Sequence, residues 1–419
     1  MPRRRWWIAL LLGLGVLINF FDRINLSVSH AALSTAFGIS DVGFGYLSSA
    51  YAWTYGLSQI PIGVLLDKYG VKRIGRISTL LWSVATFSAA TARGLGGLFA
   101  ARFLLGIGEA PTFPANAKAI GQWFPPEERS LAASIFDSAA KLSSAIGVPL
   151  IGILLIHVGW RWGFAATGFI SFLYFVLFYR MYSEPQEDPR LSAEERRIIQ
   201  GNQSVSVQNP PESAMASLGY LLRQTKILGL ALGFGSYNYL FFLLLTWLPS
   251  YLASELHLDL LHSFLYTGAP WLCATVVDLL VGGWLVDFLI RRGWNASNIR
   301  RTVLAGGLGL GLGILGAIHA RSKTEALIWI TISLCGLSAS APVSWTIPSL
   351  IAPQSSVATV GGIMNFSSQI SGIAASIITG YVVSASHSFA TAFYIAAAYL
   401  LIGMGGYIFL LGRIEPIRA

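Results

Sequence analysis

The sequence predicts an all-α polytopic membrane protein with twelve transmembrane helices in two pseudo-symmetric six-helix bundles. First, the 419 residues are 54% hydrophobic and only 11% charged, with a mean hydropathy of +0.62, whereas a soluble domain carries about 25% charged residues. Second, about twelve apolar runs of membrane-spanning length follow one another along the chain. Third, one polar stretch, residues 184–225, divides these runs into two equal sets.

Each apolar run suits a membrane-spanning helix, which needs about 20 mostly apolar residues. The runs are 6–29, 43–66, 76–92, 98–123, 130–156, 163–183, 226–252, 264–290, 302–320, 325–351, 361–384 and 390–411. They are much longer than the strands of a membrane barrel, which need about 9–11 residues. Many contain glycine or proline, which spanning helices tolerate better than soluble helices do.

The polar stretch predicts a linker between two domains, residues 1–183 and 226–419. It is charged and contains proline, and it is too short for a sizeable soluble domain. Within it, residues 191–200 predict a short surface helix, because Ser192 can act as the N-cap with Glu195 three residues later.

Basic residues predict the orientation of the chain. One set of loops, which includes both ends, is rich in arginine and lysine, as in residues 3–5, 68–76 and 291–301. The opposite loops carry Arg93, Arg161, Arg321 and Lys323. This bias predicts that both termini are cytoplasmic, and we expect a multi-pass protein of the plasma membrane, of the bacterial inner-membrane type. The net charge of +9 then reflects topology; we expect a monomer in the lipid bilayer and no nucleic-acid partner.

The two halves share a short repeat at the end of their second spans. Gly63 and Asp67 lie in a Gly-x-Leu-x-Asp sequence followed by a basic cluster that includes Arg73, and Gly283 and Asp287 occupy the same places in the second copy. The glycine allows close helix packing, the aspartate can accept hydrogen bonds from the N-terminus of the next helix, and the basic residues suit an anionic leaflet. The alternative is two unrelated turns.

Four charges lie inside predicted spans, namely Asp22, Arg23, Arg102 and Glu109. A charge at mid-bilayer costs about 2.5–3.5 kcal/mol, so these residues must pair or line a wet cavity. Arg102 and Glu109 share one helix face about 10 Å apart, whereas Asp22 and Arg23 point about 100° apart. A net-neutral cluster is predicted, in which protonation of an acid frees an arginine for a ligand carboxylate. The alternative is a static network of salt bridges.

These features resemble the major facilitator superfamily, whose members have twelve spans, a central linker and the paired loops. Within it, four segments resemble the anion:cation symporters: residues 18–25, 53–63, 102–111 and 246–249. The resemblance implies alternating-access symport of protons with sugar acids such as galactonate, glucarate and hexuronates. It also implies that Asp22 and Glu109 are the protonatable acids, that Arg23 and Arg102 are the anion-binding and coupling cations, and that protons replace any other cofactor.

Further polar residues in the spans are candidate ligands for substrate hydroxyls, although such residues also join helices to one another. They are Tyr55, Gln59, Tyr237, Asn238, Ser344, Trp345 and Asn365. The resemblance favours Tyr55, Trp345 and Asn365. Ser344 and Trp345 lie between Pro342 and Pro348, where a broken helix would expose backbone groups.

Three more charges are harder to interpret. Asp137 and Lys141 are one turn apart and can neutralise each other, or Lys141 can offer a further cation to a polyhydroxy acid or dicarboxylate. A lysine here departs from the galactonate-type carriers. Asp278, in the eighth run, is an unpaired acid that lies either in the cavity or near Asp287.

Enzyme signals are weak. No pair of histidines has zinc spacing with a carboxylate base, and there is no nucleotide-binding Walker motif. We therefore expect no metal site and a proton-coupled importer of an aldonate, aldarate or hexuronate. Its proton coupling should lie in the first half, which holds nearly all the buried charge. An exchanger or facilitator without proton coupling is the alternative on the same fold, and a membrane-embedded enzyme or sensor is the alternative from another class.

Overall fold

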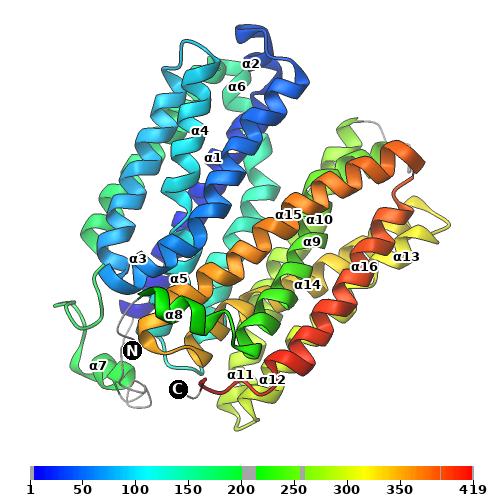
Figure 1. Ribbon diagram of the computed structural model, residues 1–419. Coiled ribbons are helices and arrows are strands. Elements are labelled where there is room, and N and C mark those ends of the chain that lie inside the picture. Colours follow the sequence, from blue (N-terminus) through cyan, green and yellow to red (C-terminus); the bar gives the residue numbers. More distant parts are fainter. Residues whose placement is uncertain (1–3, 201–213, 255–259, 387, 418–419) are drawn as a thin grey trace.

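The computed structural model describes residues 4–200, 214–254, 260–386 and 388–417, and within them every regular element is helical. Two groups of helices lie side by side (Figure 1). The beginning of the first helix and the end of the chain lie on the same side of the molecule, which we call the terminal side. Away from it, the two groups diverge. The predicted architecture of twelve spans in two bundles is confirmed.

The first bundle contains two long helices that each cross the bundle twice. Its elements are α1 (Arg4–Val28), α2 (His30–Phe37), α3 (Asp41–Ala90), α4 (Leu95–Glu109), α5 (Thr112–Trp123) and α6 (Arg129–Met181). Gly70 interrupts α3 and Gly159 interrupts α6, each with φ of 80°. Glycine adopts this left-handed conformation without the cost that a Cβ imposes, so the chain reverses there. The fourth span is formed by α4 and α5 together.

The second bundle repeats this count with more irregular helices. Its elements are α9 (Thr225–Ser254), α10 (Leu260–Val277), the π-helix η1 (Asp278–Leu285), α11 (Val286–Arg291), α12 (Ala296–Gly311), α13 (Ile314–Ile318), α14 (Lys323–Ile351), the 3-10 turn η2 (Gln354–Ser356), α15 (Val357–Ser386), α16 (Ala390–Gly405) and the π-helix η3 (Gly406–Leu411). Among the described residues, eight helical segments are long and apolar enough to cross a membrane, judged by length and composition. The expected break of α14 between Pro342 and Pro348 is wrong, because one helix runs through both prolines.

Along the chain, two short helices separate the bundles, α7 (Ala193–Gln200) and α8 (Ala214–Leu221). The predicted surface helix is confirmed, and the Ser192 Oγ accepts a hydrogen bond from the Glu195 N–H at 3.1 Å, as an N-cap does. The Glu195 carboxylate in turn pairs with Arg5 of α1 at 3.2 Å, which ties α7 to the first bundle. The domain boundaries at 183 and 226 stay a prediction.

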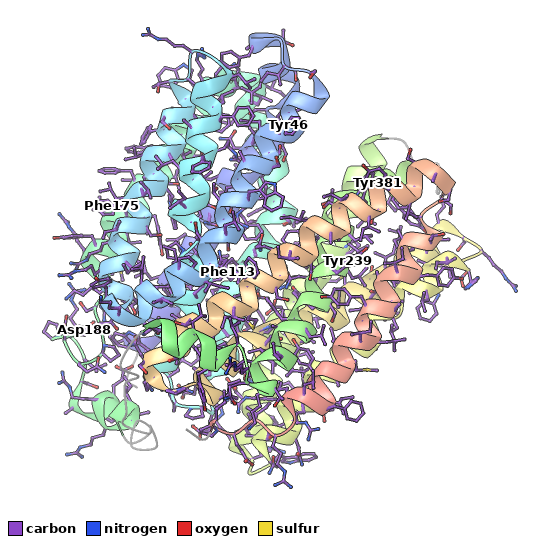
Figure 2. All side chains as sticks on the ribbon, viewed as in Figure 1. Tyr46, Phe113, Phe175, Asp188, Tyr239 and Tyr381 are labelled. Carbon is purple, nitrogen blue, oxygen red and sulfur yellow. The ribbon has the colours of Figure 1, made fainter. Side chains whose placement is uncertain are left out.

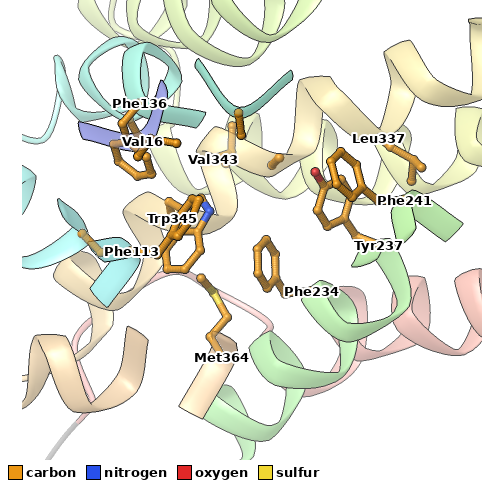
Figure 3. Packing of buried hydrophobic residues seen from close by; sticks show 14 of the residues in the cluster. Val16, Phe113, Phe136, Phe234, Tyr237, Phe241, Leu337, Val343, Trp345 and Met364 are labelled. Carbon is orange, nitrogen blue, oxygen red and sulfur yellow. The ribbon is translucent and has the colours of Figure 1, made fainter. Parts of the chain in front are cut away.

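Aromatic rings from both bundles pack together where the bundles meet. Trp345 of α14 stacks on Phe113 of α5, with ring centroids 5.2 Å apart, and its edge meets Phe234 of α9, also at 5.2 Å (Figure 3). Figure 2 places Phe113 at the junction of the two groups of helices. Such pairs contribute about 0.5–1.5 kcal/mol each beyond simple burial, so this cluster supports the junction between the bundles.

The repeated loop motif joins the bundles on the terminal side. Asp67 accepts hydrogen bonds from the N–H groups of Ala358 at 3.1 Å and Thr359 at 2.7 Å, at the start of α15. Asp287 accepts from the N–H groups of Ser130 at 3.2 Å and Leu131 at 2.7 Å, at the start of α6. Each carboxylate therefore sits at the positive end of a helix in the opposite bundle. The expectation that each aspartate binds the next helix along the chain is wrong, because that helix begins beyond the chain reversal.

The motif glycines allow these contacts. A Cβ atom at Gly63 would lie 2.7 Å from the Ala358 oxygen, and one at Gly283 would lie 2.9 Å from the Ser134 Cβ. Arg73 is exposed at the surface. Among the described residues, the hydrogen bonds and ion pairs that join the bundles lie between the terminal side and the middle of the molecule. The terminal side is therefore the closed side in this conformation.

We expect Asp67→Asn to open the terminal side, because it weakens the bonds to α15 and removes the ion pair with Lys118 at 2.7 Å. Hydrogen bonds to a charged group contribute about 1.5–3 kcal/mol. Ser349, which Arg129 binds at 3.2 Å, is replaced by cysteine in a protein from which Cys273 and Cys335 have been removed. This cysteine should react with a maleimide about tenfold faster in the Asp67→Asn variant than in the parent protein.

The matched control is Glu187→Gln, which removes a pair with Lys72 at the surface and should leave the rate unchanged. Equal labelling of Asp67→Asn and the parent protein would contradict this role for Asp67.

Candidate functional site

A cavity lies between the bundles near the middle of the molecule. The space within it that a water-sized sphere can occupy amounts to about 50 Å³. Eight residues predicted from the sequence line it: Arg23, Tyr55, Asp137, Lys141, Tyr237, Asn238, Trp345 and Asn365. Both bundles contribute, so a solute in this space would contact both.

Arg23 of α1 brings a positive charge to this cavity, and the protein holds it with its own carboxylate. The Arg23 Nε donates to the Glu109 Oε2 at 3.1 Å, and the Tyr51 hydroxyl donates to the same oxygen at 2.6 Å. The guanidinium also lies over the rings of Phe20 at 4.7 Å and Tyr55 at 4.8 Å. The side chain of Arg23 is 18% exposed, whereas that of Glu109 is fully buried. An anion entering the cavity would therefore compete with Glu109 for Arg23.

Asp22 and Arg102 lie behind this pair rather than on the cavity. With Thr86 they line a separate, tightly packed gap that has no room for a water-sized sphere. The Asp22 carboxylate accepts from the Ser171 hydroxyl at 2.8 Å, and Arg102 donates to the Asp22 carbonyl oxygen at 3.4 Å. Of the four charges, the structure thus places Arg23 on the cavity wall, Glu109 buried beside it, and Asp22 and Arg102 in a separate gap. Because neighbouring residues on a helix point about 100° apart, Asp22 and Arg23 cannot face the same space.

A polar contact across the bundles lies beside Arg23. The Asn365 amide of α15 donates to the Tyr55 hydroxyl at 3.1 Å and to the Gln59 Oε1 at 2.9 Å. Gln59 itself is fully buried and does not line the cavity. These residues present amide and hydroxyl groups suited to a polyhydroxy solute, and their hydrogen bonds join the two bundles.

Ser344 does not reach the cavity, so the structure does not support its predicted contact with substrate. Its hydroxyl lies 2.9 Å from the Tyr407 hydroxyl and donates to the Ser340 carbonyl. The neighbouring Trp345 occupies the cavity side of α14, and the next residue on a helix points about 100° away.

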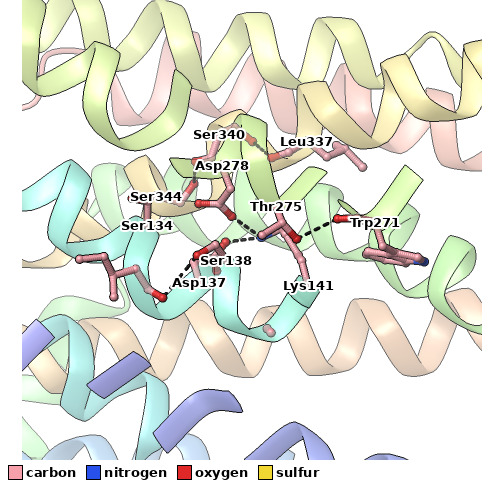
Figure 4. A network of polar contacts seen from close by, with 12 residues as sticks. Ser134, Asp137, Ser138, Lys141, Trp271, Thr275, Asp278, Leu337, Ser340 and Ser344 are labelled. Carbon is pink, nitrogen blue, oxygen red and sulfur yellow. Dashed lines mark hydrogen bonds and ion pairs between the residues drawn. The ribbon is translucent and has the colours of Figure 1, made fainter. Parts of the chain in front are cut away.

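A second buried charge cluster spans the bundles at Lys141. Its ammonium donates to Asp137 on the same helix and to Asp278 of η1 at 2.7 Å (Figure 4). The structure therefore decides the open question of Asp278, which pairs with Lys141 and not with the loop motif. Lys141 pairs with Asp137, as one sequence interpretation predicted. It also lines the cavity, and its contact with a substrate stays a prediction.

Sequence reasoning did not assign several other cavity residues to the site. They are Phe113, Ala140, Phe234, Phe241 and Phe242. The cavity also includes Phe20 and two polar residues of the eleventh predicted run that are candidate ligands for hydroxyls, Ser368 and Gln369; these two lie three and four positions after Asn365 and so share its face. An aromatic residue in an apolar run does not differ in polarity from its neighbours, so the sequence does not mark it as a cavity residue.

A larger hollow lies on the terminal side of the first bundle. Its walls are mostly charged and include Asp67, Arg73, Lys118 and Glu184. It lies within one bundle rather than between the two, so a solute there would not contact both halves. We therefore place the candidate site in the smaller central cavity.

Comparisons with known proteins identify the family of the chain. Residues 12–376 match the Major Facilitator Superfamily. The chain belongs to this superfamily. It is therefore a multi-pass membrane transporter and not an enzyme.

Superfamily relatives align along almost the whole chain. This protein is 38% identical to the uncharacterized transporter YybO of Bacillus subtilis (strain 168), in an alignment that covers 99% of this chain and 95% of YybO. It is 33% identical to the probable galactarate/D-glucarate transporter GarP of Escherichia coli (strain K12), covering 99% and 96%. The solved structure of the proton:xylose symporter XylE bound to 6-bromo-6-deoxy-D-glucose aligns with a TM-score of 0.75 at 16% identity, covering 97% and 96%, and shows the shared fold.

We expect Tyr51→Phe to destabilise the protein more than Tyr55→Phe does. Tyr51 donates to a carboxylate, and such a bond contributes about 1.5–3 kcal/mol, whereas the bond of Tyr55 to the Asn365 amide contributes about 0.5–1.5 kcal/mol. The two rings stack 5.5 Å apart, so each variant is the packing control for the other. Melting temperatures of the purified proteins check the order, and an equal or larger loss in Tyr55→Phe would contradict it.

Proposed function

We propose that this transporter imports a sugar acid, namely an aldonate, aldarate or hexuronate, together with protons by alternating access. The observation that carries the proposal is the Arg23–Glu109 pair, in which a cation at the cavity wall is held by a fully buried acid. When a proton binds Glu109, the carboxylate loses its charge and Arg23 becomes available to a substrate carboxylate. When substrate and proton leave, the pair forms again.

The pair has the physical properties that this exchange needs. A buried ion pair contributes little net stability, because removing both charges from water costs about as much as their attraction returns. Removing one partner costs about 3–5 kcal/mol, so Arg23 should always have an anion beside it. Either the Glu109 carboxylate or a substrate carboxylate can occupy the position beside Arg23. Binding of the substrate therefore depends on protonation of Glu109. Asp22 lies behind Glu109 and is the second acid through which a proton can pass.

Substrate selection would use the polar groups of both bundles. Arg23 and Lys141 provide positive charge at the cavity wall, and Asn365, Asn238 and Tyr55 provide donors and acceptors for hydroxyl groups. Trp345 offers a flat apolar surface for the face of the carbon chain. The similarity to a probable galactarate/D-glucarate transporter supports a sugar acid.

The orientation follows from the basic loops. We place the protein in the plasma membrane as a monomer, with the terminal side in the cytoplasm, because the arginine-rich loops lie there. The closed terminal side then faces inward, and the divergent side faces outward. Opening of the Asp67 and Asp287 contacts would give the opposite conformation.

We expect Glu109→Gln to abolish accumulation driven by a pH gradient while leaving exchange intact. Glutamine imitates the protonated acid, so Arg23 stays available but no proton is carried. Purified protein in vesicles, supplied with labelled galactarate or galactonate, measures both processes.

Glu187→Gln is the matched control, since that carboxylate is exposed, and it should accumulate substrate normally. Accumulation by Glu109→Gln at the level of the unaltered protein would contradict proton coupling through this residue. Transport without proton movement in the unaltered protein would favour the exchanger instead.

We expect Asn365→Ala to weaken substrate binding by about fivefold to tenfold, because each lost hydrogen bond contributes about 1 kcal/mol. Ser344→Ala should leave the affinity unchanged, since its hydroxyl faces Tyr407. Titration of each purified variant with the sugar acid compares them, and a larger loss in Ser344→Ala would contradict the assignment of this cavity.

A further inference from the structure

Lys141 is shared by two carboxylates that come from different bundles. Asp137 lies one turn earlier on α6, and Asp278 begins η1 in the second bundle. All three side chains are nearly or completely buried, with Lys141 at 1% and Asp278 at 0% exposed. Asp137 and Lys141 line the central cavity, and Asp278 lies behind Lys141. Asp278 supplies the ion pair that connects this cluster to the second bundle, and the Lys141 ammonium also lies 5.8 Å from the centre of the Phe241 ring of α9.

The charges of this cluster do not balance. Two carboxylates and one ammonium leave a net charge of −1, whereas the Arg23–Glu109 pair is neutral. An unbalanced charge in a membrane interior is costly, and one proton on either acid makes the cluster neutral. The Asp278 Oδ1 has no hydrogen-bond donor and is buried, so this oxygen has a free place for a proton.

The surroundings of Asp278 restrict which groups exchange protons with it. The titratable groups facing it are Asp137 and Lys141 from α6 and Tyr237 from α9. α14 presents Ser340 and Ser344, which are uncharged, and Thr275 of α10 donates its hydroxyl to the Trp271 carbonyl at 2.8 Å (Figure 4). Lys141 is therefore the charged group that lies between Asp278 and the cavity, and a change in the charge of Asp278 reaches the cavity through Lys141.

The local helix geometry supports a functional role for Asp278. The helix changes from α to π at this residue, and π-helical turns occur frequently at functional sites. The ion pair of Asp278 with Lys141 also joins the bundles near the cavity, beyond the loop contacts on the terminal side. A change in this pair alters both the charge of the cavity and the attachment of one bundle to the other.

We propose that Asp278 is a further proton-carrying residue besides Glu109 and Asp22, which holds Lys141 when ionised and releases it to a substrate carboxylate when protonated. This inference rests on the proposed proton-coupled import. It places one proton site in the second bundle, whereas the sequence predicted proton coupling in the first. One proton and one substrate carboxylate are then transported together at Lys141. A second proton and a second carboxylate are transported together at Arg23.

The test is the number of protons moved per galactarate in vesicles, obtained from the pH gradient and membrane potential that stop net flux. We expect Asp278→Asn to move one proton fewer than the unaltered protein. Asp278→Glu, which restores the acid, should keep the original ratio. Thr275→Val is the matched control, because Thr275 lies about one turn away and is also buried, at 8% exposed, and it should also keep the ratio.

The Asn variant should fold, because Lys141 keeps Asp137 as its partner and the cluster becomes neutral. The pH dependence of galactarate affinity in detergent gives a second measurement, and the slope of log Kd against pH should fall by one unit in Asp278→Asn. An unchanged proton ratio or slope in that variant would overturn the inference. Absence of proton movement in the unaltered protein would instead overturn the proposed function itself.

Discussion

The rest of the site depends on one buried ion pair, between the Arg23 guanidinium and the Glu109 carboxylate. Neither charge can remain alone in a membrane interior, so each arrangement of the cavity must supply Arg23 with an anion. Tyr51 and the aromatic rings around the guanidinium fix its position without neutralising it. The pair therefore resembles an occupied anion site, and in the proposed mechanism its occupant is replaced when Glu109 receives a proton.

The requirement that a buried charge has a partner also explains the contacts between the bundles. On the terminal side, Asp67 and Asp287 are stabilised by the N-terminal N–H groups of helices in the opposite bundle, so these charges are satisfied only while the bundles lie together. In the middle, Asn365 joins Tyr55 and Gln59 across the same interface. A solute that contacts these groups would compete with bonds that hold the bundles together, which links binding to the relative position of the bundles.

The sequence predicted the fold because long apolar runs are unambiguous, and it found Arg23 and Glu109 because a charge in such a run stands out. It did not predict that these two residues pair, since the rotation of α1 against α4 is set by packing. Ser344 was assigned to the cavity because polarity alone does not say which helix face a residue occupies. The partner of Asp278 lies on another bundle, and Phe113 resembles any other residue of an apolar run, so neither could be recognised.

The most direct test is an experimental structure of the protein with galactarate bound in the central cavity. The account predicts that a substrate carboxylate lies within hydrogen-bond distance of the Arg23 guanidinium and that the Glu109 carboxylate has moved away from it. A structure in which galactarate is bound while the Arg23 Nε remains about 3.1 Å from the Glu109 Oε2 would contradict the account.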